Sequence, residues 1–364
     1  MPKTYSNLFE QVYQYDNLYE AYIEARKNKK YREGVLRFSA NLEENLIDLQ
    51  NHLIWQSYKV GEYRKTLIHV PKKRIIMVLP FRDRVLQWAI YRVVAPIFER
   101  SYITDSYGCI QGRGNLNAVR RIQYWMRLLS KGGGEVYALS MDVRKYFFRI
   151  PHTVIMDALA RKIKDPRMMW LFETIICDPN QDFGLQTDVV DLEHAQMVKG
   201  VGMPVGSLVS QMIANIILND LDQYAKRKLR IPYYLRYVDN FAEFGLDKIV
   251  LHKHKKLLER FLFDKLGLTL SAANVTRARD GFEFAGYRIW ADKLELRKST
   301  TLRMKRRLKH VMSLYYEGLM SMEKARSVLA SYRGMMMHCD NPALMEKVHE
   351  DFVLTKPFAE DPPV

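Results

Sequence analysis

The interpretation of this chain starts from Tyr233-Tyr234-Leu235-Arg236-Tyr237-Val238-Asp239-Asn240-Phe241-Ala242-Glu243-Phe244. Two short runs of aromatic and β-branched residues flank the Asp-Asn pair, which predicts a β-hairpin with a carboxylate at its tip. Asp and Asn both favour tight turns, so Asp239 alone would be an ordinary turn residue. A second carboxylate, Asp142, lies at the end of a buried-looking strand much earlier in the chain. The chemistry of the protein therefore depends on whether Asp142 and Asp239 meet.

Composition favours a globular protein that binds a polyanion. The 364 residues include 57 Lys and Arg against 41 Asp and Glu, which gives a formal charge of +16, and 48% of them are hydrophobic. A chain of this length buries a substantial core and forms one elaborated domain or several subdomains. The positive excess favours nucleic acid as a partner, with a merely basic soluble protein as the alternative.

Cysteine usage and hydropathy predict a cytoplasmic protein without a membrane partner. Cys109, Cys177 and Cys339 lie far apart and lack a zinc-like spacing, so we expect reduced thiols. The N-terminal residues contain no apolar signal core. No apolar run approaches the roughly 20 residues that a membrane-spanning helix needs.

Hydrophobic periodicity predicts alternating helices and strands. Helices are expected over residues 1–60, 81–98, 168–177 and 247–266 and in a basic region from Ser299 onward. Two more are expected after Pro151, continuing to Ile163, and after the glycine-rich turn that begins at Gly200, continuing to about Leu229. Strands are expected in a pair joined by a basic turn over residues 64–81, over residues 135–150 and at residues 268–270. Asn115 is placed to cap a helix after a glycine-rich segment, and residues 178–200 are expected to form a loop or small insertion.

The two carboxylates fit a metal site in a palm-like α+β layer. Carboxylates at close range repel each other, and a divalent cation relieves that repulsion. Mg²⁺ takes one or two carboxylates together with phosphate oxygens and water, so Asp142 and Asp239 would suffice when a nucleotide is bound. A two-metal site would activate a primer hydroxyl and stabilise the leaving pyrophosphate, and phosphoryl transfer would need no protein nucleophile.

From about residue 40 to residue 340, the order of segments resembles that of reverse transcriptases. The segments that carry the resemblance are Ser140–Phe148 for the first catalytic motif, Tyr237–Asn240 for Tyr-x-Asp-Asp, Gly281–Trp290 for the primer grip and Lys73–Arg82 for the fingers. The resemblance implies an α+β right-hand polymerase fold, whose palm is an antiparallel sheet with helices on one face. The implied parts are an N-terminal helical extension (1–60), fingers (61–134), a palm (135–290, with an insertion near 160–205) and a helical thumb with a tail (291–364).

The resemblance also implies roles for individual residues. The metal ligands would be Asp142, the Val143 carbonyl and Asp239, with the part of Asn240 left open, and the ion would be Mg²⁺ or alternatively Mn²⁺. The incoming nucleotide would contact Arg74, Arg82, Phe147, Gly206 and Gln211, where Phe147 is the gate against a ribose 2′-hydroxyl. The nucleic acid would contact Arg303, Lys305, Arg306, Arg307 and Lys309. The ordinary alternatives are surface arginines, a core phenylalanine, a helix N-terminus and a solvated helix face.

Two details narrow the resemblance. Ser210-Gln211 stands where most bacterial relatives carry Ser-Pro, which is similar to the enzymes of diversity-generating retroelements. Those enzymes copy a template RNA with errors at adenines and work with a small basic accessory protein. Compact antiphage-defence reverse transcriptases are the alternative. The implied partners are template RNA, primer, cDNA and deoxynucleoside triphosphates.

Two departures from the family pattern affect the chemistry. Asn240 replaces the second aspartate, which removes one negative charge near the metals while keeping a good turn residue. The segment Leu268–Asn274 lacks the lysine that many relatives use as a general acid toward pyrophosphate. The alternative of another class is therefore an RNA-binding scaffold that kept the palm and lost efficient chemistry.

Overall fold

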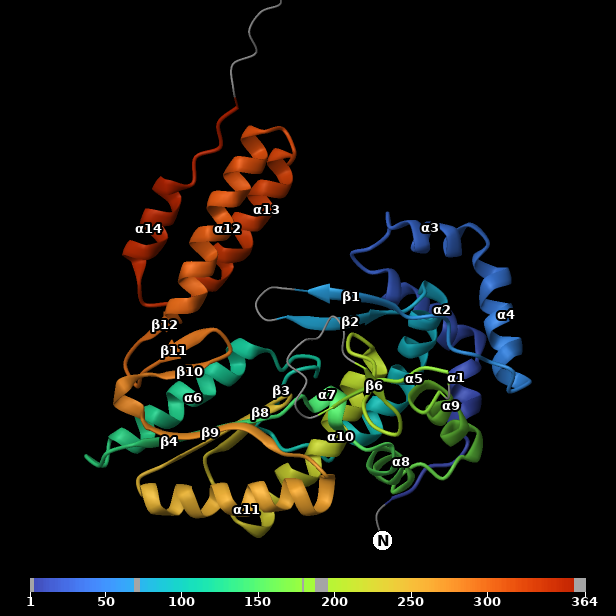
Figure 1. The fold of residues 1–364 in the computed structure, drawn as a ribbon, viewed down its shortest axis with the longest axis horizontal. Helices are drawn as coiled ribbons and strands as arrows, with labels where there is room; N and C mark the ends of the chain where they lie inside the picture. The colour runs from blue at the N-terminus through green and yellow to red at the C-terminus, as the bar shows by residue number, and fades with distance from the viewer. Residues whose placement is uncertain (1–2, 69–72, 179, 187–195, 357–364) are drawn as a thin grey trace, which may run out of the picture. The chain divides into compact units, whose positions relative to one another are not determined.

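The computed structural model describes residues 3–68, 73–178, 180–186 and 196–356 (Figure 1). Its longer helices are α1 (Leu8–Tyr13), α2 (Tyr15–Arg26), α3 (Glu33–Ala40), α4 (Leu42–Ile54), α5 (Phe81–Glu99), α6 (Asn115–Ser130), α8 (His152–Ala160), α9 (Pro166–Ile176), α10 (Leu208–Gln223), α11 (Lys248–Leu266), α12 (Lys298–Tyr316), α13 (Met322–Met336) and α14 (Pro342–Asp351). The described residues also form a four-residue helix, α7 (Tyr146–Arg149), a π-helical turn (Tyr224–Lys228) and a 3-10 turn (Ala278–Asp280).

In the described part of the chain, the strands form four sheets. They are β1 (Arg64–Ile68), β2 (Arg74–Val78), β3 (Ser106–Tyr107), β4 (Tyr137–Val143), β5 (Gly184–Leu185), β6 (Met197–Val198), β7 (Tyr234–Tyr237), β8 (Asn240–Gly245), β9 (Leu270–Arg277), β10 (Phe282–Phe284), β11 (Tyr287–Ile289) and β12 (Leu294–Leu296). The largest sheet has the order β3-β7-β8-β4-β9. It is mixed and not purely antiparallel as expected for the palm, because the short strand β3 pairs in parallel with β7. The predicted α+β class is confirmed.

The chain divides into two compact units, and it crosses between them within strands β4, β8 and β9. The first unit comprises Met1–Arg113, Ser140–Ala242 and His252–Asn274, and the second comprises Gly114–Leu139, Glu243–Leu251 and Val275–Val364. The ranges expected for fingers, palm and thumb stay a prediction. In the described part of the chain, no helix combines the length and the apolar character that spanning a bilayer requires.

The N-terminal third of the first unit is helical, as its periodicity predicts. Leu46, Leu49 and Leu53 of α4 are fully buried and form the apolar face of that helix. Helix α2 packs on α5, whose buried residues also meet α10 (Figure 1). These helices form a packed body beside the strands that carry the candidate site.

The hairpin β1–β2 packs against the segment that precedes α10. Its antiparallel register pairs Arg64 with Val78, and the predicted basic turn at 69–72 lies outside the described residues. Ile75 and Met77 pack into a buried cluster with Tyr63, Leu79 and Phe183. The Met77 amide donates to the Val205 carbonyl (2.9 Å), so β2 is held against the start of the α10 segment.

Several boundaries differ from the expectation. Strand β4 ends at Val143, because α7 follows where the strand was expected to continue to residue 150. Asn115 is the first residue of α6, and the cap position is Gly114, with no side-chain cap. Strand β9 runs to Arg277, far beyond the expected residues 268–270. The described part of residues 178–200 includes the two-residue pair β5–β6.

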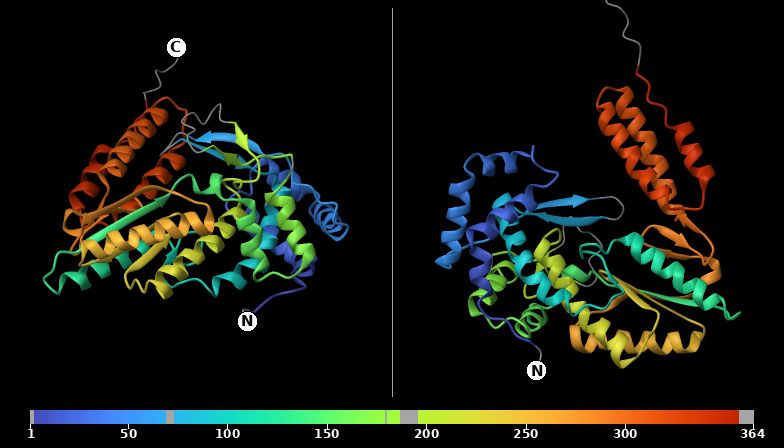
Figure 2. Two further views of the ribbon diagram at one scale, coloured as in Figure 1. Left: turned by 60° about the horizontal axis from the view of Figure 1, so that its bottom comes forward. Right: turned by 180° about the vertical axis from the view of Figure 1, so that it is seen from behind.

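The second unit has a small sheet and three helices. Strands β10, β11 and β12 are antiparallel neighbours, and Phe282 stacks with Phe284 and meets Phe244 edge-on. Helix α13 packs against both α12 and α14, and the three helices lie side by side in Figures 1 and 2. The face of α12 that is buried consists of Thr300, Met304, Leu308, Val311 and Tyr315.

Candidate active site

The structure brings Asp142 and Asp239 together. Asp142 is the penultimate residue of β4, and Asp239 ends the turn between β7 and β8. The amide of Val143 donates to the backbone oxygen of Asp239 (3.2 Å), which ties the strand end to the turn. Burial raises the pKa of Asp239 above its usual value, and the negative charge of Asp142 raises it further. The two carboxylates therefore face the mutual repulsion that a bound cation relieves.

One side chain orients each carboxylate. The Ser271 hydroxyl on β9 lies within hydrogen-bond distance of the Asp142 backbone oxygen (3.2 Å) and donates to its carboxylate Oδ2. The Asn240 amide donates to Oδ1 of Asp239 (3.1 Å), which lowers the pKa of that carboxyl. Sequence reasoning missed Ser271, because nothing in the pattern of residues 268–274 marked it. Asn240 acts here as a hydrogen-bond donor, which an aspartate could not be.

The turn itself is Val238-Asp239, one residue earlier than the Asp-Asn pair that the sequence favoured. Val238 has φ 55°, a left-handed conformation that is a true outlier for a β-branched residue. Its amide donates to the Tyr107 carbonyl (3.1 Å). Gly108 lies against the turn with φ +86°, and a Cβ there would come within 2.7 Å of Val238 Cγ2. Glycine is therefore required at position 108.

A fully buried cation, Arg236, lies behind this turn. Its side chain and that of Asp222 on α10 are both 0% exposed and pair at 2.8 Å. Burial disfavours the charged guanidinium, yet the Asp222 carboxylate prevails and raises the pKa of Arg236 above its ordinary value. One signal of this pair was present in the sequence, an arginine in an otherwise apolar and aromatic strand, but the pair was not identified from it.

The residues expected at the nucleotide lie in part near the carboxylates. Arg74 opens β2, and its charge lowers the pKa of Asp239, so it acts on the site electrostatically. Gly206 (φ +104°) lies against β2, where a Cβ would come within 3.0 Å of Ile76 Cγ2. Phe147 is the second residue of α7 and is half-buried. Its backbone carbonyl accepts a hydrogen bond from the Met203 amide (2.7 Å). Gln211 is half-buried in the first turn of α10.

Arg82 has different surroundings. Its guanidinium lies over the Tyr58 ring (5.4 Å to the centroid) and donates to the Lys59 carbonyl (2.8 Å). It also lies 3.5 Å from the buried Asp83 carboxylate. Among the described residues, these contacts of Arg82 do not involve Arg74. That Arg74 and Arg82 bind the same incoming nucleotide therefore stays a prediction.

The basic residues of α12 lie in the second unit. Lys305, Arg306, Arg307 and Lys309 are exposed, and Arg303 is half-buried. The buried face of the helix is apolar, so these cations lie on the face that solvent reaches. The arrangement suits contact with a polyanion, and it equally suits a solvated face.

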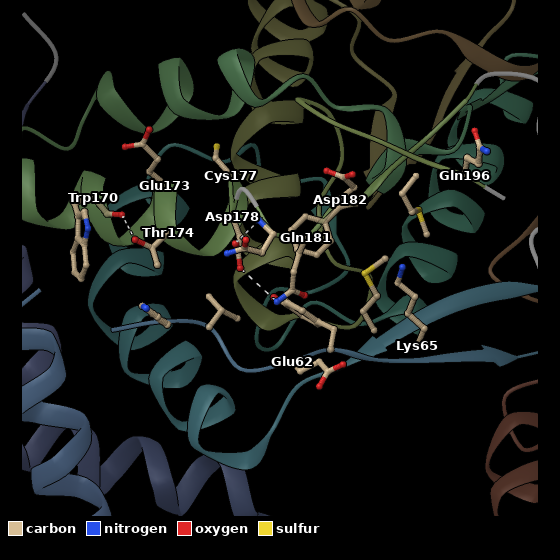
Figure 3. Close-up of a pocket in the computed structure, with 17 residues that line it drawn as sticks. Glu62, Lys65, Trp170, Glu173, Thr174, Cys177, Asp178, Gln181, Asp182 and Gln196 are labelled. Carbon is tan, nitrogen blue, oxygen red and sulfur yellow. Dashed lines mark hydrogen bonds between the residues drawn. The ribbon is translucent and has the colours of Figure 1, made fainter. Parts of the chain in front are cut away.

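A pocket of ≈ 1350 Å³ lies elsewhere in the first unit (Figure 3). It is lined by residues that include Lys65 of β1, Trp170 and Glu173 of α9, and Asp178 and Asp182 after that helix. Neither Asp142 nor Asp239 lines it. This pocket is therefore distinct from the carboxylate pair.

The carboxylate pair suits Mg²⁺ by its donor chemistry. Asp142 and Asp239 supply hard oxygen ligands and carry unrelieved like charges. In the ranges that the structure describes, no group of three His, Cys, Asp or Glu could hold a metal alone. Phosphate oxygens and water would have to complete the shell, as Mg²⁺ sites at nucleotides require.

Comparison with known proteins gives a consistent result. A family model described as "Reverse transcriptase (RNA-dependent DNA polymerase)" matches residues 64–289. The chain is 25% identical over 290 residues to Protein YkfC of Escherichia coli strain K12, covering 69% of this chain and 72% of that protein. It is 25% identical over 268 residues to the group II intron-encoded protein LtrA of Lactococcus lactis subsp. cremoris, covering 69% of this chain and 41% of that protein.

Solved structures give a weaker similarity. Telomerase from Candida albicans, in complex with the TWJ fragment of telomeric RNA, aligns with 12% identity and a TM-score of 0.47. That alignment covers 84% of this chain and 56% of the telomerase chain. The chain thus spans little more than half of that protein and less than half of LtrA.

Proposed function

Because the chain belongs to the reverse transcriptase family of RNA-dependent DNA polymerases, we propose that it extends a primer into cDNA along a template RNA. The observation that supports this most is the approach of Asp142 and Asp239, from a strand end and a turn, onto one site. Two oriented carboxylates beside a cationic side chain suit phosphoryl transfer, which depends on positioning and charge.

The residues of the chain have distinct tasks in this proposal. Asp142 and Asp239 hold Mg²⁺ or Mn²⁺, with the Val143 carbonyl as a further ligand. When bound there, the metal would supply charge stabilisation for the reacting phosphate and the primer hydroxyl. Ser271 and Asn240 keep the two carboxylates oriented. Arg74, Arg82, Gly206 and Gln211 contact the incoming deoxynucleoside triphosphate, and Phe147 excludes a ribose 2′-hydroxyl.

The finer assignment is a diversity-generating retroelement enzyme that copies its template with errors at adenines. It is supported by Ser210-Gln211, where Ser210 is buried and Gln211 is half-buried at the start of α10. A small basic accessory protein and a cytoplasmic location belong to the same proposal. A compact antiphage-defence enzyme is the second candidate, and a catalytically reduced RNA-binding scaffold is the candidate of another class.

Primer extension with purified protein tests the proposal. We expect Mg²⁺-dependent deoxynucleotide incorporation on an RNA template, with substitutions concentrated opposite template adenines. Faithful copying would remove the retroelement assignment and leave the polymerase. Tight RNA binding without incorporation, with either Mg²⁺ or Mn²⁺ and with accessory protein present, would favour the scaffold.

Asn240→Asp should lower the Mg²⁺ concentration needed for half-maximal extension about fivefold, because a second charge beside Asp239 is worth ~1 kcal/mol in an exposed setting. The measurement is extension rate against free Mg²⁺ and against free Mn²⁺. Asn28→Asp, which adds the same charge at an exposed position between α2 and α3, is the control. An unchanged metal dependence would show that position 240 does not tune the metals.

Lys305→Gln combined with Lys309→Gln should reduce the salt dependence of RNA binding. Each lost phosphate contact lowers the slope of log affinity against log salt by about 0.7–0.9, while base preference stays the same. Fluorescence anisotropy from low to high salt measures the slope. Lys253→Gln with Lys256→Gln, two exposed cations on α11, is the control of equal charge. Equal slopes in both pairs would indicate that α12 is a solvated face.

A further inference from the structure

The backbone of the catalytic turn is held by one buried side chain. Arg236 donates from all three of its side-chain nitrogens. Nε donates to Asp222 Oδ1 and Oδ2 (2.9 Å each), and Nη2 donates to Asp222 Oδ2 (2.8 Å) and Ser106 Oγ (3.0 Å). Nη1 donates to Asn215 Oδ1 (2.9 Å) and to the Val238 carbonyl (2.9 Å). These contacts use every N–H of the planar fork. Only the last of them reaches the turn itself.

The contact to Val238 falls where the backbone is strained. Val238 has φ 55°, and such outliers persist only where the surroundings over-determine them. Its amide is fixed by the Tyr107 carbonyl and its carbonyl by Arg236 Nη1. Asp239 is the next residue, so the two peptide units that meet at the Val238 Cα are each held by one hydrogen bond just before the carboxylate.

The other contacts of the guanidinium fix its own position. Asn215 accepts a hydrogen bond from Arg236 and donates one through Nδ2 to the carbonyl of Gly108 (3.1 Å), the glycine that lies against Val238. Asp222 also accepts from the Tyr234 hydroxyl (2.9 Å). The pair is 0% exposed, so no water competes with these bonds. Because the guanidinium is itself held by Asp222, Asn215 and Ser106, its hydrogen bond can fix the position of the Val238 carbonyl.

We propose that Arg236 is a positioning residue, which keeps Asp239 aimed at the site shared with Asp142 by holding the Val238 carbonyl. The inference rests on the proposed function for its kinetic consequence. Its structural consequence, a rigid turn, stands independently of any activity. Asp222 holds the guanidinium in place and so acts one step further from the site.

Arg236→Lys is the direct test, since lysine keeps the charge and loses the fork. We expect kcat to fall about 100-fold with the KM for deoxynucleotide nearly unchanged, because small misplacements of a reacting group cost that much. Amide hydrogen exchange of a peptide spanning residues 234–241 should become faster. Arg161→Lys is the control. It alters a surface pair with Asp220, which lies on α10 as Asp222 does, and it should change neither kcat nor the exchange rate.

Rescue separates positioning from general damage. Val238→Gly, added to Arg236→Lys, should recover about tenfold in kcat, since glycine adopts the left-handed turn without strain. If Arg236→Lys does not fold, Arg236→Met with Asp222→Leu replaces the buried pair by apolar side chains of similar size, a change that proteins often tolerate. That folded variant should show the same fast exchange and the same loss of kcat.

The two proposals fail in different ways. A wild-type protein that never polymerises overturns the proposed function, while hydrogen exchange still decides whether Arg236 holds the turn. The positioning role alone is overturned if the wild-type protein polymerises and a folded variant, either Arg236→Lys or Arg236→Met with Asp222→Leu, matches it in kcat and in amide hydrogen exchange.

Discussion

Asp239→Asn should reduce primer extension to below about one thousandth of the wild-type rate while the protein still folds. Asparagine has nearly the same shape, and its side-chain oxygen can still accept the hydrogen bond from Asn240 that Asp239 now receives at 3.1 Å. It lacks the charge that a divalent cation needs at this site. Metal ions contribute several kcal/mol of charge stabilisation to such reactions, and each ~1.4 kcal/mol is a factor of ten in rate.

Single-turnover extension on an RNA template measures the loss, and thermal unfolding checks the fold. Asp264→Asn is the matched control, because Asp264 is a carboxylate on α11 in a surface pair with Arg260 (3.2 Å). It should retain full rate. A rate for Asp239→Asn within tenfold of wild type would mean that Asp239 is a turn residue without a part in the chemistry.

Asp222→Ala should lower the free energy of unfolding by about 3–5 kcal/mol. Removing one partner of a buried ion pair leaves the other charge uncompensated in a site that water does not reach. Arg236 would lose three of its contacts at once, and the Tyr234 hydroxyl would lose its acceptor. Chemical denaturation, with the slope compared to confirm that the transition is unchanged, measures the difference.

Helix α10 provides the control for this effect. Asp220 also pairs with an arginine, Arg161, at 2.7 Å, but the side chains are 29% and 54% exposed. Asp220→Ala should therefore cost no more than about 1 kcal/mol, as surface pairs do. Similar costs at positions 220 and 222 would mean that the buried pair is no more important to the fold than a surface contact.

The sequence located the two carboxylates and the family resemblance, because these depend on local pattern and order. A strand before Asp142 and a hairpin around Asp239 follow from alternation and turn chemistry alone. Membership of the family is confirmed by the match over residues 64–289. The prediction of an RNA-directed DNA polymerase agrees with that family.

What the sequence could not supply was burial created by distant segments. Arg236 stands in a strand where a polar residue usually faces solvent, and only α10 and β3 packing around it make it a buried cation. Strand β9 was underestimated because Ser271, Ala272, Ala273 and Asn274 lack apolar alternation, and pairing with β4 imposes the strand instead. The position of the turn was misjudged by one residue, since a valine with positive φ contradicts local preference.

The buried guanidinium also has a consequence for folding kinetics. Its partners include Ser106, which is separated from it by 130 positions along the chain, and Asp222, separated by 14. Long loops close slowly, and contacts of large sequence separation are rewarded only after closure. The turn that carries Asp239 is therefore expected to reach its native geometry only after Ser106 and Asp222 have come into contact with Arg236. In refolding experiments, compaction and helix content should recover before polymerase activity does.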